Sequence, residues 1–248
     1  MSLEGKVAIV TGAGDAGPGG LGVHYAAALA QAGAAVTVAD IDGAGAERIA
    51  KRLADAGHKA IGVCVDVANE AEVKAMVAAT IKAFGGVDIL VNNAGLARDK
   101  WNEGVNLPTE DWMRILAVNT LAPLVCARAC RDSMKARGGG AIVNQSSSAA
   151  FDEYGAYSVT KMALVGMTNI LSKELAPDGI RVNAIAPGVM TGKVPPDVLK
   201  MVLAQQKVTR QGKPQDLIGA LLYLCSDASS FVTGITIRVD GGVTRGRL

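Results

Sequence analysis

The sequence predicts a single α/β domain, residues 1–248, in which seven parallel strands form a doubly wound sheet with helices on both faces. Short runs of Val, Ile and Ala alternate with helical stretches along the whole chain, as repeated βαβ units require. Half of the residues are hydrophobic but only 4% are aromatic, so we expect a core of Ala, Val, Ile and Leu. The length suits one large core, and the chain contains no repeat or linker.

The predicted elements follow one another in regular order. The expected strands are residues 6–11, 35–40, 60–65, 87–92, 141–146, 180–185 and 235–239. The expected helices are residues 20–32, 43–56, 69–84, 110–136, 156–176 and 214–226. The least regular stretch runs from Val189 to Lys207 and includes Pro195 and Pro196. We expect it to be a mobile flap over the substrate, with a plain surface connection as the alternative.

The first strand leads directly into a glycine-rich segment. The run Lys6–Thr11 (KVAIVT) has the composition of a buried parallel strand, and residues 11–22 (TGAGDAGPGGLG) follow it before a helix begins. Strand, glycine turn and helix in this order bind a dinucleotide pyrophosphate, because backbone N–H groups and the helix N-terminus attract the anion. The second strand ends at Asp40, where a carboxylate can accept a hydrogen bond from a ribose 2′-hydroxyl. These features predict a Rossmann fold.

Three groups suited to proton transfer lie close together further along the chain. Tyr157 and Lys161 are four residues apart and share a helix face, and Ser147 ends an apolar stretch ahead of them. The pKa of a phenol is about 10, and a fixed cation beside the phenol lowers this pKa toward working pH. Tyr157 could then exchange a proton with a substrate oxygen that Ser147 also contacts. By itself the spacing is more typical of a surface helix, and the glycine-rich segment favours the catalytic interpretation.

With these motifs in place, the chain from about Lys6 to Gly242 resembles the single-domain short-chain dehydrogenase/reductase family. The matching motifs are the Thr-Gly start of the glycine-rich segment, Asp66-Val67, Asn92-Asn93-Ala94-Gly95, Asn119, Ser147, Tyr157, Lys161 and Pro187-Gly188, in this order. Several motifs in the family's order are far more specific than any one of them. The resemblance covers nearly the whole chain.

The resemblance implies a role for each matching residue. The catalytic residues would be Asn119, Ser147, Tyr157 and Lys161, with Asn119 holding a relay water and Lys161 also gripping the nicotinamide ribose. The residues that bind the cofactor, NAD, would be Gly12, Gly14, Asp15, Gly20, Leu21, Gly22, Asp40, Ile41, Asp66, Val67, Asn93, Ala94, Gly95, Tyr157, Lys161, Pro187, Gly188, Val189 and Thr191. The family also implies a homotetramer, in which helices 110–136 and 156–176 pair across one two-fold axis and strand 235–239 across another.

The sequence departs from the family pattern in three places. The glycine-rich segment is four residues longer than usual, so its individual phosphate contacts stay open. Ser147 and Tyr157 are about three residues closer than usual, which leaves Ser146 and Ser148 as alternatives for the catalytic serine. Thr191 follows the Pro-Gly motif one residue early.

We therefore expect an NAD-dependent oxidoreductase that interconverts a secondary alcohol and a ketone. Asp40 followed by Ile41, with no Arg or Lys in the glycine-rich segment, argues against binding the 2′-phosphate of NADP. A 3-oxoacyl-thioester reductase is the nearest alternative, and a cofactor-binding regulator without turnover is a more distant one. The short loop after Ser148 carries Asp152 and Glu153, which we expect to disfavour an anionic substrate if they face the pocket.

Charge and composition exclude other function classes. A formal charge of +2 with dispersed basic residues gives no surface for a nucleic acid. We expect no membrane partner, because no apolar run reaches spanning length and no signal segment is present, so the protein should be cytoplasmic. The four cysteines have no metal or disulfide spacing and should be buried, reduced thiols. We expect neither a metal nor a catalytic histidine.

Overall fold

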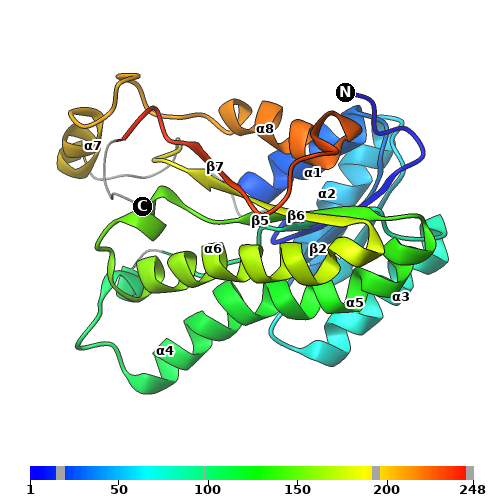
Figure 1. Ribbon diagram of the computed structural model, residues 1–248, viewed down its shortest axis with the longest axis horizontal. Coiled ribbons are helices and arrows are strands. Elements are labelled where there is room, and N and C mark those ends of the chain that lie inside the picture. Colours follow the sequence, from blue (N-terminus) through cyan, green and yellow to red (C-terminus); the bar gives the residue numbers. More distant parts are fainter. Residues whose placement is uncertain (15–19, 98, 192–195, 244–248) are drawn as a thin grey trace.

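A parallel sheet of seven strands forms the centre of the molecule (Figure 1). The computed structural model describes residues 1–14, 20–97, 99–191 and 196–243. The strands are β1 Val7–Thr11, β2 Ala35–Asp40, β3 Ala60–Cys64, β4 Ile89–Asn92, β5 Gly140–Gln145, β6 Ile180–Pro187 and β7 Thr236–Val239, in the order β3-β2-β1-β4-β5-β6-β7. The chain changes its winding direction between β1 and β4, where a crevice opens at the carboxyl ends of the strands.

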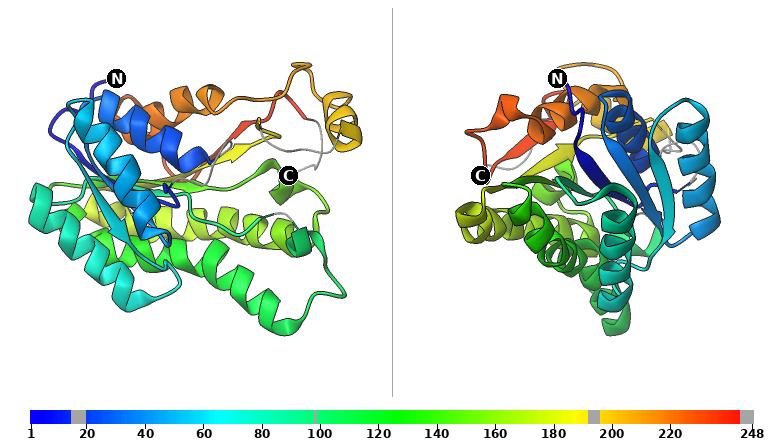
Figure 2. Two further views of the ribbon diagram at one scale, coloured as in Figure 1. Left: turned by 180° about the vertical axis from the view of Figure 1, so that it is seen from behind. Right: turned by 90° about the vertical axis from the view of Figure 1, so that its right-hand side faces the viewer.

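Helices cover both faces of this sheet (Figure 2). One face is covered by α1 Leu21–Gln31, α2 Gly43–Asp55 and α8 Gln215–Cys225, and the other by α3 Glu70–Phe84, α5 Ala122–Ala136 and α6 Gly155–Leu175. The helix α4 Thr109–Leu116 packs against α6 through Ile115 and Ala156. The helix α7 Pro196–Leu203 lies beyond the end of β7, near one end of the molecule (Figure 1). Short 3₁₀ turns cover Asp99–Asn102 (η1), Ser148–Phe151 (η3), Ala176–Asp178 (η4) and Asp227–Ser229 (η5).

The two faces hold separate hydrophobic cores, because successive side chains of a strand point to opposite sides. Val10 of β1 packs with Leu29 and Leu221 on the α1 side. Its neighbour Ile9 packs on the other side, with Met76 and Leu171. Both cores consist mainly of Ala, Val, Ile and Leu, as the composition predicts. Each expected strand is present, with ends shifted by at most two residues.

The expected helix 110–136 differs from the prediction in the middle. A π-helical turn, η2 Ala117–Leu121, joins α4 to α5, and the Ala122 N–H donates to the Ala117 carbonyl five residues back. Together they form a helix of 28 residues, Thr109–Ala136, which is long and apolar enough to cross a membrane, contrary to our expectation. This helix packs against the sheet through residues such as Cys126 and Met134, so we read it as a core helix.

Two further expectations are corrected. The stretch 189–207 is not irregular throughout, since α7 begins at Pro196, and proline is well tolerated in the first turn of a helix. Cys64 is exposed instead of buried, because it ends the edge strand β3, which has a neighbour on one side only. Cys126, Cys130 and Cys225 are buried free thiols, as predicted.

Candidate active site

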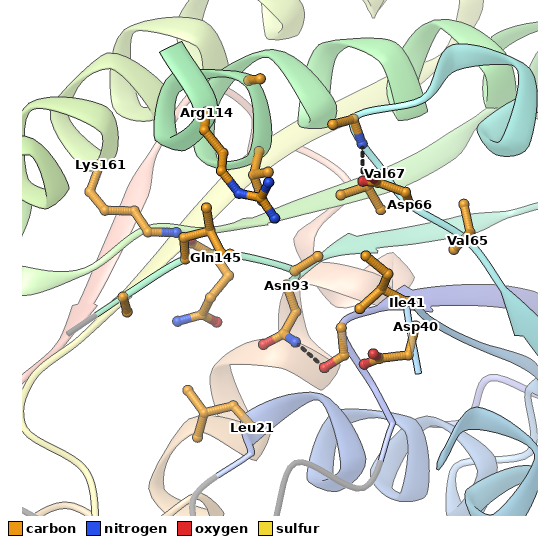
Figure 3. A pocket seen from close by; sticks show the side chains of 18 of the residues that line it. Leu21, Asp40, Ile41, Val65, Asp66, Val67, Asn93, Arg114, Gln145 and Lys161 are labelled. Atoms are coloured by element: carbon orange, nitrogen blue, oxygen red, sulfur yellow. Dashed lines mark hydrogen bonds between the residues drawn. The ribbon is translucent and has the colours of Figure 1, made fainter. Parts of the chain in front are cut away.

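A cavity of about 460 Å³ lies in the crevice at the carboxyl ends of the strands (Figure 3). We call one end the Asp40 end, formed by Asp40, Ile41, Asp66 and Val67. The other is the Lys161 end, formed by Gln145, Ser146, Tyr157 and Lys161. Asn93, between them, comes from the turn after β4, and Figure 3 shows its side chain near the middle of the cavity. The cavity thus joins the two groups of residues that the motifs indicate.

The carboxylate of Asp40 is fixed by the backbone around it. Its Oδ2 accepts a hydrogen bond from the Gly14 N–H at 2.8 Å, and its Oδ1 accepts one from the Asp42 N–H at 2.9 Å. A Cβ at Gly14 would lie 2.8 Å from Asp40 Cγ, so only glycine permits this approach. Each carboxylate oxygen has a second lone pair that can still accept a hydrogen bond from a ligand hydroxyl. Ile41 beside it is 66% exposed.

The glycine-rich segment and the turn after β4 are tied together. Asn93 Nδ2 donates to the carbonyls of Thr11 and Gly12 at 2.9 and 2.8 Å, and the N–H groups of Asn93 and Ala94 both donate to Thr11 Oγ1. Gly12 has a φ of +64°, and a Cβ there would lie 2.6 Å from Ala94 Cα. Gly20 caps α1 without a side chain, which leaves the start of this helix open to an anion. A dinucleotide pyrophosphate fits such a cradle.

Lys161 is almost fully buried at the opposite end of the cavity. Its Nζ donates to the Gln145 carbonyl at 2.8 Å and lies 5.7 Å from the centre of the Tyr157 ring. The two residues therefore share a face of α6, as their spacing predicts. Burial lowers the pKa of Lys161 to about 8 because the ammonium loses contact with water. The group is close to titration at working pH.

Asn119 lies in the π-helical turn η2, close to Gly95 of the cavity wall. Its side chain is fully buried, its Oδ1 accepts from the Leu96 N–H at 2.8 Å, and its Nδ2 donates to the Leu96 carbonyl and to Thr160 Oγ1. A Cβ at Gly95 would lie 3.2 Å from Asn119 Oδ1 and 3.5 Å from Lys161 Nζ. The Asn119 amide and the Lys161 ammonium therefore flank Gly95. Because glycine has no side chain, space remains between these two groups.

The three consecutive serines have different hydrogen bonds. Ser146 is buried, and its hydroxyl donates to the Lys161 carbonyl at 3.1 Å. Ser147 Oγ accepts from the Ala149 N–H at 3.1 Å, which leaves its hydroxyl hydrogen available for a ligand oxygen. Ser148 begins η3. Ser146 lines the cavity, whereas Ser147 is outside the described lining.

The structure brings together most of the predicted cofactor residues. Those that line the cavity are Gly12, Gly20, Leu21, Asp40, Ile41, Asp66, Val67, Asn93, Ala94, Gly95, Tyr157 and Lys161. Gly14 and Gly22 instead allow close packing behind the wall. Gly188 and Val189 line a second cavity of about 270 Å³, and Pro187 and Thr191 lie next to it in the chain. Asp15 lies outside the described residues.

Two polar side chains in the wall were not expected. Gln145 ends β5, and Arg114 projects from α4 into the cavity in Figure 3. A glutamine at the carboxyl end of a central strand, directly before the serines, is a sequence signal for a polar group in the wall. Nothing in the sequence marked Arg114. Asp152 and Glu153 do not line the cavity: Glu153 is exposed, and its N–H donates to Asp152 Oδ1 at 2.9 Å.

Comparisons with known proteins agree with this arrangement. A family model described as enoyl-(acyl carrier protein) reductase matches residues 14–244. An uncharacterized oxidoreductase of Mycobacterium tuberculosis is 43% identical over 246 residues, which cover 97% of this chain and 98% of that protein. The cis-4-hydroxycyclohexanecarboxylate dehydrogenase of Sinomonas cyclohexanicum is 37% identical, with 96% of each chain covered.

Among solved structures, a 7α-hydroxysteroid dehydrogenase complexed with NADH and 7-oxo glycochenodeoxycholic acid is similar to this chain, with a TM-score of 0.91 and 32% identity. The match covers 98% of this chain and 96% of that one. The similarity therefore extends over both ends of the cavity.

Proposed function

Because the chain belongs to the short-chain dehydrogenase/reductase family, we propose that it is an NAD-dependent enzyme that interconverts a secondary alcohol and a ketone. That it is an oxidoreductase follows from the family and from its dehydrogenase relatives. One observation carries the finer proposal. Tyr157 and Lys161 line one end of the cavity, with Asn119 next to Gly95 of its wall, while the carboxylate of Asp40 is fixed at the other end.

The residues present fit a nicotinamide dinucleotide. Asp40 would hold the adenosine ribose, the open start of α1 would hold the pyrophosphate, and Lys161 would hold the nicotinamide ribose. When bound, the dinucleotide accepts or supplies the hydride. Preference for NAD over NADP is supported by Asp40, whose carboxylate would repel a 2′-phosphate, and by exposed Ile41, which offers no compensating cation.

The proton would be handled by the chain's own residues. Tyr157 would exchange the proton of the substrate hydroxyl, and Ser147 would donate a hydrogen bond to the same oxygen. The hydroxyl of Ser146 is already committed to the α6 backbone, which favours Ser147 for this role. The Lys161 ammonium would favour the ionised phenol, and Asn119 would extend the proton path past Gly95.

A 3-oxoacyl-thioester reductase is the second candidate. The description of the matching family model, which names an acyl carrier protein, favours it. A regulator without turnover is supported by no observation, because Tyr157 and Lys161 both lie in the cavity wall.

One screen tests these alternatives. Purified protein is assayed for formation of reduced nicotinamide from NAD with cyclic, aromatic, steroid and acyl-thioester alcohols, with and without the substitution Tyr157→Phe. We expect turnover with a cyclic or steroid alcohol that the substitution abolishes. Preference for the acyl thioester would establish the second candidate, and lack of turnover with every alcohol would contradict both enzymes.

We also propose that the protein is a cytoplasmic homotetramer. Exposed apolar side chains lie on α4 and α6, namely Met113, Val159 and Ile170, and near β7, namely Phe231 and Ile235. Two separate apolar faces suit two two-fold contacts. Light scattering at micromolar concentration should give a mass of four chains, and a mass of one 25.3 kDa chain would contradict the proposal. The buried free thiols suit a reducing compartment.

A further inference from the structure

A buried tyrosine is paired with the glutamine in the cavity wall. Tyr25 lies in α1, fully buried, and its Oη is 2.6 Å from Gln145 Oε1 at the end of β5. The two residues are 120 positions apart in the sequence. The bond joins the helix that follows the glycine-rich segment to the strand that precedes the serines. It therefore connects the two motifs of the candidate site.

The pairing fixes the orientation of the glutamine amide. Burial raises the pKa of the Tyr25 phenol well above its ordinary value, so the phenol is neutral and carries its proton. A buried phenol donates this proton to an acceptor, which in Gln145 is Oε1. The amide nitrogen must then point away from Tyr25.

The amide nitrogen has one hydrogen to spare. Nε2 donates to the Ser146 carbonyl at 3.3 Å, and an NH₂ group carries two hydrogens. The described residues provide no partner for the second hydrogen. Figure 3 shows the side chain of Gln145 extending from β5 into the cavity, in the direction of Leu21 at the start of α1. The spare hydrogen is therefore available to an acceptor in the cavity.

The backbone of the same residue holds Lys161. The Gln145 carbonyl accepts from Lys161 Nζ at 2.8 Å, so one residue contacts the buried lysine and presents an amide donor to the cavity. Lys161 and Gln145 both line this end of the cavity, so a ligand bound there can contact both residues. Ribose hydroxyls and phosphate oxygens are acceptors of the kind that an amide NH₂ recognises.

We propose that Gln145 binds the nicotinamide half of the dinucleotide, its side-chain NH₂ donating to an oxygen of the nicotinamide ribose, and that Tyr25 is a positioning residue that holds this amide. The inference rests on the proposed function, because it requires a bound dinucleotide. The proposed contact comes from the central sheet, next to the catalytic residues, whereas the contacts expected from the sequence come from the glycine-rich segment and the loops.

The test compares binding of NADH with binding of ADP, which keeps both phosphates but lacks the nicotinamide and its ribose. Gln145→Leu should weaken NADH binding about threefold to tenfold, the effect of one hydrogen bond, and leave ADP binding unchanged. Tyr25→Phe should weaken NADH binding by about twofold to threefold, again without effect on ADP. Gln145→Glu keeps an acceptor for Tyr25 but lacks the amide donor, so it should also lose NADH affinity.

A double variant separates packing from recognition. Removing one partner of a buried hydrogen bond is costly, whereas removing both is nearly neutral. Tyr25→Phe with Gln145→Leu should therefore unfold at a higher denaturant concentration than the sum of the single effects predicts, and should still bind NADH as weakly as Gln145→Leu does. The control is Thr37→Val, which breaks the buried Thr37–Thr80 hydroxyl pair away from the cavity. It should lower stability and leave NADH binding unchanged.

Two results would overturn the inference. One is unchanged NADH binding in Gln145→Leu and Gln145→Glu. The other is an equal loss of NADH and ADP binding, which would mean a general disturbance of the site. Wild-type protein that binds neither ligand would refute the proposed function as well, so the two failures are distinguishable.

Discussion

The two ends of the cavity are built in different ways. At the Asp40 end, a carboxylate on the last residue of β2 is held by backbone N–H groups of neighbouring loops, beside a largely exposed Ile41. At the Lys161 end, Lys161 and Asn119 are buried and held by other residues of the central strands and helices. The first arrangement suits recognition of a ligand hydroxyl near water. The second suits proton transfer, because burial brings a lysine pKa down to about 8.

The two ends should also differ in how well they tolerate insertions and substitutions. Surface loops accept insertions more readily than buried elements do, and the glycine-rich segment is four residues longer than the family pattern. The buried end has little such freedom. Lys161 and Asn119 have specific partners in the Gln145 carbonyl and Thr160, and loss of one partner leaves another group buried and unpaired.

The largest effect is expected at the Lys161 end. Tyr157→Phe keeps the ring but removes the hydroxyl that exchanges the proton, so turnover should fall by about a hundredfold or more. NADH binding should persist, because the Asp40 end and the start of α1 are untouched. Steady-state rates and NADH titration check this, with Tyr223→Phe on α8 as a control that should keep its activity. Near-normal turnover of Tyr157→Phe would refute the assigned mechanism.

A smaller effect on catalytic efficiency is expected at the Asp40 end, together with a change in the preference for NAD over NADP. Asp40→Ser should lower catalytic efficiency with NAD by about tenfold, since hydrogen bonds to a charged acceptor are lost. The same change should raise efficiency with NADP, because the repulsion of the 2′-phosphate is gone. Efficiencies measured with both cofactors provide the check. Wild-type efficiency with NADP equal to that with NAD would contradict this assignment.

The pKa of Lys161 predicts an effect on stability in the absence of cofactor. The folded pKa of about 8 lies below the unfolded value, so above about pH 8 the unfolded state holds more protons. The contribution of Lys161 to the free energy of unfolding should therefore rise with pH, by about 1 kcal/mol between about pH 8 and about pH 9.

Denaturant unfolding of wild type and Lys161→Met measures this contribution as the difference between the two proteins at each pH. The comparison removes the shared effect of the buried thiols, because burial raises their pKa values in the folded state and only the unfolded thiols titrate in this range. A difference that stays constant, or that shrinks as pH rises, would show that Lys161 is not titrating as its burial implies.

The smallest effect concerns substrate charge. We expect the wild type to prefer cyclohexanol over 4-hydroxycyclohexanecarboxylate by at most a few fold, because Asp152 and Glu153 follow the serines closely but lie outside the cavity wall, where water weakens their repulsion of an anion. The double change Asp152→Asn with Glu153→Gln should narrow this preference. If the acid is already the better wild-type substrate, or if the preference is unchanged by the substitutions, these carboxylates take no part in selection.

Much of the fold could be predicted from local sequence. Apolar runs and glycine stops located all seven strands, because parallel strands buried on both faces need continuous apolar residues. The errors have physical reasons as well. A π-helical turn has the same apolar pattern as the helix around it, and the exposure of Cys64 depends on which strand lies at the edge of the sheet.

The candidate site, like the fold, could be predicted from the sequence only in part. The sequence by itself determined the residues whose spacing is local: the glycine-rich segment, Asp40 at a strand end, and Tyr157 with Lys161 on one helix face. Only the tertiary structure decided what lies around them. It placed Asn119 beside Gly95 and paired Tyr25 with Gln145. Such contacts depend on how distant elements pack, because a hydrogen bond between residues 120 positions apart leaves no periodic pattern in the chain.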